Sequence, residues 1–337
     1  MYESFRLNQM SRICLYYIRE PERDRWLPGD RYVRPIIRRI IRGSSRPGGI
    51  DKVFINLCLG LDKLGISYKV NLPFSELKKH DRVSILGRGL SCLDGYNREN
   101  PIVAGIGLMT HPSEWPNLYK QYPVVKYLQH SHWANEVYKP YFGDRCTIWP
   151  VGINTDIWQP TQSKSKSVDF LIYNKIMWGY DQQVVALLEP IRHTLTQKGL
   201  SFEELRYGFY QPQDYQQALS RCRAMIFLCE HESQGLAYQE CLSSGVPIFA
   251  WDQGECLDPN RFKWGMPHIP ATSVPYWDER CGVKFNNINE FSTKLEEFLE
   301  NLKLKKFNPR NYILENLTLE KCAKNHLEIM EILENYQ

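Results

Sequence analysis

Two glutamates with a glycine between them are the residues of this sequence best placed to do chemistry. Glu232 and Glu240 lie eight positions apart in the stretch Glu-Ser-Gln-Gly-Leu-Ala-Tyr-Gln-Glu. An apolar run that predicts a strand ends just before this stretch, and a helix is predicted to begin within it, near Ser233 or Gly235. The first N–H groups of a helix have no partner inside it, and the helix dipole adds attraction for anions. The start of this helix is therefore a predicted anion site, which a phosphate group would suit.

The spacing of the two glutamates matches the size of a nucleotide fragment. Eight residues of helix span about 12 Å, close to two turns, so the two carboxylates lie on nearly the same face. That distance matches a diphosphate plus a ribose, and Glu240 is predicted to accept hydrogen bonds from the ribose hydroxyls. Two glutamates at this spacing are usually a solvated helix face. Glu240, however, sits between Leu236 and Leu242 rather than in a charged run, which favours function.

Short apolar runs alternate with amphipathic helices, which is typical of βαβ units around a parallel sheet. In the first half, strands are predicted over residues 12–18, 68–72, 82–86, 102–108, 124–128 and 146–149. Helices are predicted over residues 50–64 and 131–141. In the second half, strands are predicted over residues 169–173, 204–210, 224–229 and 246–250. Helices are predicted near residues 181–198, 213–221, 235–244 and 289–302, and from residue 312 to the end.

A change of composition predicts where one domain ends and the next begins. Residues 161–167 are small and polar, as in a linker, between two series of strands and helices. We therefore expect one doubly wound domain over residues 1–160 and a second over 161–311, with the helix from 312 to 337 packing back on the first. A ligand cleft would then lie between the domains, at the carboxyl ends of both sheets.

Length and composition limit the class of protein. The chain has 337 residues, 43% of them apolar, and a net charge of +4, which excludes a disordered or fibrous protein and fits two domains. It has no apolar run of roughly 18 residues and no signal-peptide pattern at its start. Its ten cysteines include no C-x-x-C pair, which favours buried, reduced thiols over disulfides or a metal site. We expect a cytoplasmic protein.

Several stretches together resemble a known enzyme family. The stretch from Glu232 to Glu240, with the Ser-Ser-Gly-Val-Pro that follows, resembles the E-x7-E motif of retaining, GT-B fold glycosyltransferases of the family 4 group. Pro-Gly-Gly at residues 47–49 resembles the glycine-rich donor loop of that family. Residues 149–160 resemble the segment that closes its first domain, and Gly254 with the glutamate after it resembles a turn in its second. The combination is more specific than any single motif.

The resemblance implies both a fold and an activity. The fold would be α/β, of GT-B type, with two Rossmann-like doubly wound domains facing a central cleft. A nucleotide-diphosphate sugar would bind mostly to the second domain and an acceptor mostly to the first, with hexosyl transfer and retention of anomeric configuration. It also implies no cofactor and no essential metal, and the sequence agrees because it contains no D-x-D triplet. The leaving diphosphate would then be stabilised by a helix start and basic side chains.

The resemblance also assigns roles to individual residues. It implies catalytic roles for Glu232, His111 and Lys175. For donor binding it implies Gly48, Gly49, Lys175, Gln234, Gly235, Leu236, Glu240 and Tyr210. Lys175 ends a predicted strand where the family has a cation, whereas the expected second cation is replaced by Met-Trp-Gly-Tyr at residues 177–180. A structural role for His111 and an ordinary turn at Gly48 and Gly49 stay open as alternatives.

A basic segment lies between the first strand and the glycine loop. Its arginines recur at helical intervals with isoleucines between them, and they are Arg31, Arg34, Arg38, Arg39 and Arg42. Such a segment can bind an anionic membrane, here at its inner face, or pack its isoleucines on its own domain. Nucleic acid is not expected, because the basic residues are confined to one short segment without a recognition motif.

Two other functions are compatible with the same motifs. A nucleotide-sugar epimerase of the same fold would need no acceptor. A non-catalytic binding or adaptor protein would tolerate the loss of the second cation. The acceptor is left open between a glycan, a lipid-linked glycan and a small molecule, and the nucleotide base is undetermined.

Overall fold

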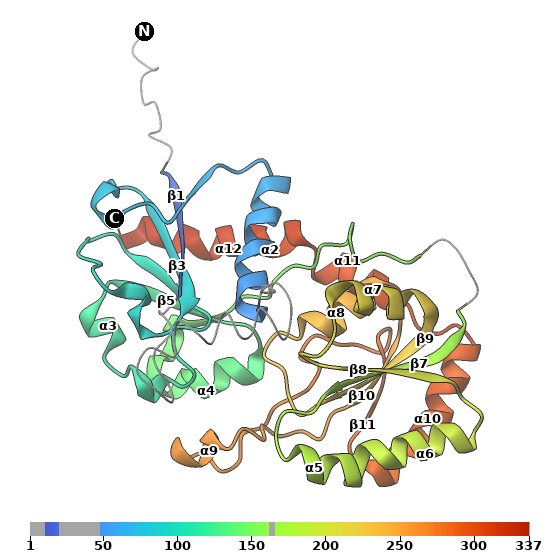
Figure 1. The fold of residues 1–337 in the computed structure, drawn as a ribbon. Helices are drawn as coiled ribbons and strands as arrows, with labels where there is room; N and C mark the ends of the chain where they lie inside the picture. Colours follow the sequence, from blue (N-terminus) through green and yellow to red (C-terminus); the bar gives the residue numbers. More distant parts are fainter. Residues whose placement is uncertain (1–10, 20–47, 162–165, 337) are drawn as a thin grey trace, which may run out of the picture.

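The computed structural model describes residues 11–19, 48–161 and 166–336, and these form two α/β domains (Figure 1). The sheet of the first domain has six strands, in the spatial order β2 (Tyr68–Val70), β1 (Ile13–Arg19), β3 (Arg82–Arg88), β4 (Ile102–Gly105), β5 (Val124–Gln129) and β6 (Cys146–Ile148). The sheet of the second has five, in the order β11 (Gly282–Phe285), β10 (Ile248–Trp251), β9 (Cys222–Cys229), β7 (Val168–Lys175) and β8 (Phe202–Arg206). Every strand pair is parallel.

Helices connect the parallel strands and cover the sheets. In the described part of the first domain these are α2 (Gly49–Lys63), α3 (Leu118–Gln121) and α4 (His132–Phe142). Below the second sheet in Figure 1 lie α5 (Tyr180–Gln183), which continues through residues 184–188 into α6 (Glu189–Gln197), and α10 (Ile288–Lys303). Above it lie α7 (Pro212–Arg221), α8 (Leu236–Ser243) and α11 (Pro309–Asn316). The short α9 (Asn260–Lys263) follows β10, and α12 (Leu319–Glu331) ends the fold. The expected doubly wound α/β domains are thus confirmed.

The last helix returns to the first domain and packs against α2 (Figure 1). The sequence places Val53, Leu57, Leu61 and Leu64 at helical spacing, and the first three are buried, whereas Leu64, which follows the last turn, is exposed. Gly60 allows the close approach, because a Cβ there would lie 2.5 Å from the carbonyl oxygen of Leu319. The chain therefore crosses between the domains twice.

The prediction of a single helix from residue 312 to the end is wrong. The chain leaves the helical conformation at Leu317 and Thr318, between α11 and α12. The N–H of Ile153 donates to the carbonyl oxygen of Leu317 over 2.8 Å, and Ile153 pairs with Thr318 in a parallel bridge. The Thr318 side chain then caps α12 by accepting from the N–H of Lys321. A contact distant in sequence therefore breaks the helix.

Strand boundaries differ from the predictions in three places. β11 was not predicted. β4 ends at Gly105, because the next residues, Ile106 and Gly107, have φ of 42° and 92°, which no strand adopts. β8 lies over Phe202–Arg206 rather than 204–210. The other predicted strands are confirmed to within two residues.

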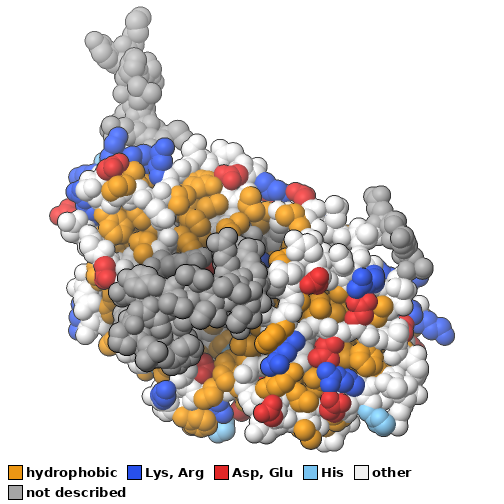
Figure 2. Space-filling model, viewed as in Figure 1, with side chains coloured by type: hydrophobic (Ala, Val, Ile, Leu, Met, Phe, Trp, Pro, Cys, Tyr) orange, Lys and Arg blue, Asp and Glu red, His pale blue; other side chains and the backbone are white. Residues whose placement is uncertain are grey.

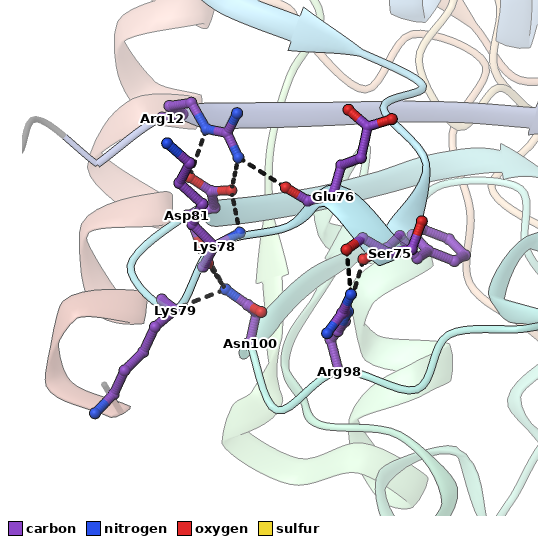
Figure 3. Close-up of polar contacts among 9 residues, drawn as sticks. Arg12, Ser75, Glu76, Lys78, Lys79, Asp81, Arg98 and Asn100 are labelled. Carbon is purple, nitrogen blue, oxygen red and sulfur yellow. Dashed lines mark hydrogen bonds and ion pairs between the residues drawn. The ribbon is translucent and has the colours of Figure 1, made fainter.

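Polar contacts tie together the amino-terminal ends of three strands in the first sheet (Figure 3). Arg12, just before β1, donates from Nε to Asp81, just before β3, over 2.9 Å. Asp81 also accepts from the N–H of Lys78 over 2.7 Å. Asn100, just before β4, donates to the carbonyl oxygens of Lys78, Lys79 and Asp81. This cluster fixes the strands at the edge opposite their carboxyl ends, so its role is structural.

The edge strand β8 is protected by charge. Side chains of both signs are interspersed over the second domain in Figure 2. Glu203 in β8 pairs with Arg221 over 2.7 Å, and Glu204 pairs with Arg192. Charged side chains on an edge strand discourage pairing with another chain.

All ten cysteines are free thiols, and eight of them are buried. Within the described residues, we find no helix with the length and apolar character needed to span a bilayer.

Candidate functional site

A cavity of about 300 Å³ lies where the two domains meet, at the carboxyl ends of β7 and β9. Lys175 ends β7 and Cys229 ends β9, and Trp133 enters from the first turn of α4 in the other domain. The described residues that line it are Trp133, Lys175, Met177, Trp178, Tyr207, Cys229, His231, Glu232 and Ser233. Doubly wound sheets bind ligands at this edge.

A larger cavity, of about 390 Å³, lies beside residues 157–161 and α7. None of the described side chains that line it is ionisable. It offers no group to carry charge or move a proton, so we place the candidate site in the smaller cavity.

Lys175 and Glu232 form an ion pair inside the smaller cavity. Only 18% of the Lys175 side chain and 11% of the Glu232 side chain are exposed. Burial alone would lower the pKa of Lys175, but its neighbours, with the Glu232 carboxylate foremost, together outweigh burial and raise that pKa above its ordinary value. Lys175 is therefore a cation at neutral pH, held where two strands end.

Glu230, the residue after β9, is fully buried and holds the neighbouring turn. Its carboxylate accepts from the N–H of Met177 over 2.9 Å and from the N–H of Trp178 over 3.0 Å. Burial raises the pKa of Glu230, and these backbone donors oppose that rise. Glu230 therefore has a structural role, because it binds backbone N–H groups, whereas Glu232, two residues later, lines the cavity.

Three rings form what we call the aromatic wall: Trp178, His231 and Trp133. Trp178 stacks on His231 with centroids 4.9 Å apart, and Trp133 meets the same imidazole edge-on at 5.4 Å. The indole N–H of Trp133 also donates to the carbonyl oxygen of Glu232 over 2.8 Å, across the domain boundary. Burial lowers the pKa of His231 to about 4, so this histidine is neutral at pH 7. The wall is uncharged, and sequence analysis missed it.

Glu240 lies on α8 and pairs with Lys52 of the first domain. Lys52 Nζ is 2.8 Å from Glu240 Oε1, and only 7% of the Glu240 side chain is exposed. Burial raises the pKa of Glu240, and Lys52 acts in the opposite direction. Each of the two glutamates thus has a lysine partner, one from each domain.

The glycine loop brings its own contacts to this region. Gly48 caps α2, and its N–H donates to the Asp51 carboxylate over 2.6 Å. A Cβ added to Gly49 would meet no described atom within 4 Å. Lys52, in the first turn of the same helix, carries the contact with Glu240. The structure therefore brings the start of α2 close to α8, as a shared cleft requires.

The residues at the start of α8 also make contacts that stabilise the fold. Gly235 has φ of 78°, and a Cβ there would collide with the Tyr238 ring. The Gln234 side chain is buried and binds Val151 of the first domain, accepting its N–H over 3.0 Å. Leu236 packs between the cores of the two domains. The α8 start is thereby fixed against the first domain.

Of the predicted site residues, only Lys175 and Glu232 line the cavity itself, and two of the others, His111 and Tyr210, are held by contacts of their own. His111 is fully buried, stacks on Trp264 with centroids 4.8 Å apart, and binds Ser113 through Nδ1 over 2.7 Å. Burial lowers the pKa of His111. The Tyr210 hydroxyl bonds to Tyr173 over 2.6 Å, and it is Tyr207 that lies beside Lys175, with the ammonium 4.7 Å from its ring.

The sequence signals for this region are uneven. The E-x7-E spacing and the strand end at Lys175 point to residues that the structure brings into or beside one cleft. Nothing in the local pattern marks Glu230, His231 or Trp133, because their neighbours come from other strands and from the other domain. The predicted membrane segment at residues 31–42 lies outside the described residues.

Solved structures of glycosyltransferases share this fold. AviGT4, a glycosyltransferase involved in avilamycin A biosynthesis, matches with a TM-score of 0.54 at 14% identity, over 96% of this chain and 98% of that one. WaaG, a glycosyltransferase involved in lipopolysaccharide biosynthesis, gives 0.52 at 12%, over 94% and 99%. Sucrose-phosphate synthase from Thermosynechococcus elongatus gives 0.55 at 12%, over 97% and 100%.

No protein-family model and no curated protein matches the sequence. At such low identity the structural likeness concerns the fold, which is GT-B, as predicted. The family 4 assignment and the E-x7-E motif stay predictions.

Proposed function

We propose that this protein is a retaining glycosyltransferase that moves a sugar from a nucleotide-diphosphate sugar to an acceptor. The observation that carries the proposal is that Glu232 and Glu240 each pair with a lysine, Glu232 inside the cavity and Glu240 across the domain boundary. The fold is shared with proteins described as glycosyltransferases, which supports the same class of reaction.

In this proposal the donor extends from the cavity towards α2. The sugar lies against the aromatic wall, near Glu232 and Lys175. The diphosphate lies by the start of α8, where the amides of Gln234, Gly235 and Leu236 donate to it. The ribose hydroxyls donate to Glu240. His111 is fully buried against Trp264 and the Tyr210 hydroxyl is bonded to Tyr173, so any part they play is indirect.

The chemistry that we propose is same-face substitution. The bond between the anomeric carbon and the phosphate oxygen breaks, and a bond to the acceptor oxygen forms on the same face. The acceptor proton passes to the departing phosphate oxygen, whose charge Lys175 stabilises. Glu232 stabilises the positive charge that develops on the sugar.

Metal independence and a hexosyl donor belong to the same proposal. Among the described residues, no three His, Cys, Asp or Glu side chains are grouped to hold a metal ion.

Contact of the arginine segment with an anionic membrane is a separate proposal. Flotation with anionic vesicles tests it, and equal flotation of a variant with Arg38, Arg39 and Arg42 changed to Glu would contradict it.

A ligand panel tests the central claim. We expect one of UDP, GDP, ADP and TDP to raise the thermal midpoint, since a ligand at a hundred times its Kd stabilises by about 2.7 kcal/mol. The matching sugar nucleotide should then be consumed, and an NMR time course should show a product with the donor's anomeric configuration. A lack of stabilisation by every nucleotide at millimolar concentration would refute the proposal. Release of an isomerised sugar nucleotide without acceptor would indicate an epimerase instead.

A further inference from the structure

The cavity that we assign to the donor sugar carries little net positive charge. Among the described residues that line it, Lys175 is the one cation at neutral pH, and Glu232 already neutralises it. Neutral residues at positions 177–180 stand where the resemblance to the family implied a second cation. A departing diphosphate carries more negative charge than this pair can balance.

Among the described residues, Lys52 is a cation of the first domain that binds one of the motif residues directly. Its ammonium is bound to Glu240, yet 39% of its side chain is exposed, so the group is accessible from solvent. It lies in the first turn of α2, three positions after Gly49, whose Cα has open space beside it. A lysine ammonium on a flexible stem can change partners without moving the backbone.

We propose that Lys52 is a donor-binding residue. When the donor binds, the ribose hydroxyls replace Lys52 on the Glu240 carboxylate, and the Lys52 ammonium moves to the diphosphate. The inference rests on the proposed function. The exchange leaves neither group unpaired, because the ribose satisfies Glu240 and the phosphate oxygens satisfy Lys52. It also joins the domains through the donor, since Lys52 belongs to the first and Glu240 to the second.

The first test compares two lysines of the same helix. Lys52→Met keeps the side-chain stem and removes the charge. Lys63→Met is the matched control, because Lys63 pairs with Asp156 and Glu320 away from the cavity. Calorimetry is done with whichever of UDP, GDP, ADP and TDP binds the wild type. We expect Lys52→Met to weaken its binding about tenfold or more, with a weaker salt dependence, and Lys63→Met to leave it unchanged.

A second test distinguishes two roles of Lys52: binding phosphate directly, and neutralising the Glu240 carboxylate. Glu240→Gln frees Lys52, so inorganic pyrophosphate should bind this variant more tightly than the wild type. The double variant Lys52→Met/Glu240→Gln should lose that gain. Equal pyrophosphate affinity in Glu240→Gln and the double variant would overturn the proposal, as would unchanged nucleotide binding in Lys52→Met. If the wild type itself bound none of the four nucleotides, the proposed function would fail first, so the two failures are distinguishable.

Discussion

The indole of Trp178 lies flat against the imidazole of His231, with ring centroids 4.9 Å apart and planes inclined by 4°. Trp178 follows β7 and His231 follows β9, and these strands are neighbours in the parallel sheet. Their carboxyl ends therefore meet at one edge, where Glu230 holds the backbone of the Trp178 turn. An aromatic surface thus occupies the place where the sequence resemblance implied a cation.

Trp178→Ala should weaken binding of the sugar nucleotide while leaving the free nucleotide unaffected. The side chain lines the cavity assigned to the sugar, and its ring face offers apolar contact to a ligand. We expect Kd for the sugar nucleotide to rise about tenfold. Trp178→Phe keeps an aromatic face and should restore most of the affinity. Equal losses for sugar nucleotide and nucleotide would show that the wall does not contact the sugar.

Glu232→Gln and Glu240→Gln should separate turnover from donor binding. Glu232 sits beside Lys175 in the cavity, so we expect kcat to fall about a hundredfold or more with little change in KM. Glu240 is assigned to the ribose, so its variant should raise KM for the donor. Steady-state kinetics of the purified variants measure both effects. Wild-type constants in both variants would remove these residues from the site.

Gly49→Ala should impair donor binding without destabilising the fold. A Cβ there meets nothing within 4 Å, and the position is helical, so the thermal midpoint should stay the same or rise. Binding should weaken because the Cβ occupies space through which the diphosphate approaches the backbone.

Gly60→Ala is the control on the same helix. Its Cβ would lie 2.5 Å from the carbonyl oxygen of Leu319 and 2.7 Å from the Ala323 Cβ. We expect it to lower the free energy of unfolding by about 1–3 kcal/mol. If Gly49→Ala binds nucleotide like the wild type, the glycine pair is an ordinary turn.

Acid should destabilise the protein through buried histidines, and His326 offers the clearest test. It is fully buried against Trp149, with Nε2 3.1 Å from the Ser84 hydroxyl. Burial lowers its pKa to about 3, whereas an unfolded histidine titrates near pH 6.5. Between these values the unfolded state binds the extra proton. Stability is therefore lost as pH falls from about 6.5 towards 3, by up to about 1.4 kcal/mol per pH unit.

Urea unfolding of the wild type and His326→Gln at pH 7, 6, 5 and 4 checks this prediction. The variant should be less stable at pH 7 and should lose less stability per pH unit below 6.5. His193→Gln is the control, because His193 is exposed. The same slope in His326→Gln and in the wild type would contradict the prediction.

Local patterns were sufficient for most elements and for the two-domain α/β plan. The apolar runs of β7 and β9 and the apolar spacing along α2 are short-range features, and they predict the burial of Val53, Leu57 and Leu61, although not the exposure of Leu64 at the helix end. The strand end at Lys175 was predictable for the same reason. β11 was not predicted from its local pattern, and its parallel pairing with β10 places it at the edge of the sheet.

By itself, the sequence determined most of the strands and helices, the GT-B plan that their order allows, and the spacing of Glu232 and Glu240 on one segment. Only the tertiary structure decided that Ile153 interrupts the last helix at Thr318, that Trp178 covers His231, and that Lys52 reaches a carboxylate 188 positions away. The physical reason is range. The periodicity of apolar residues depends on neighbours along the chain. Contacts between different strands and domains depend instead on the order of strands in the sheet and on how one domain packs on the other.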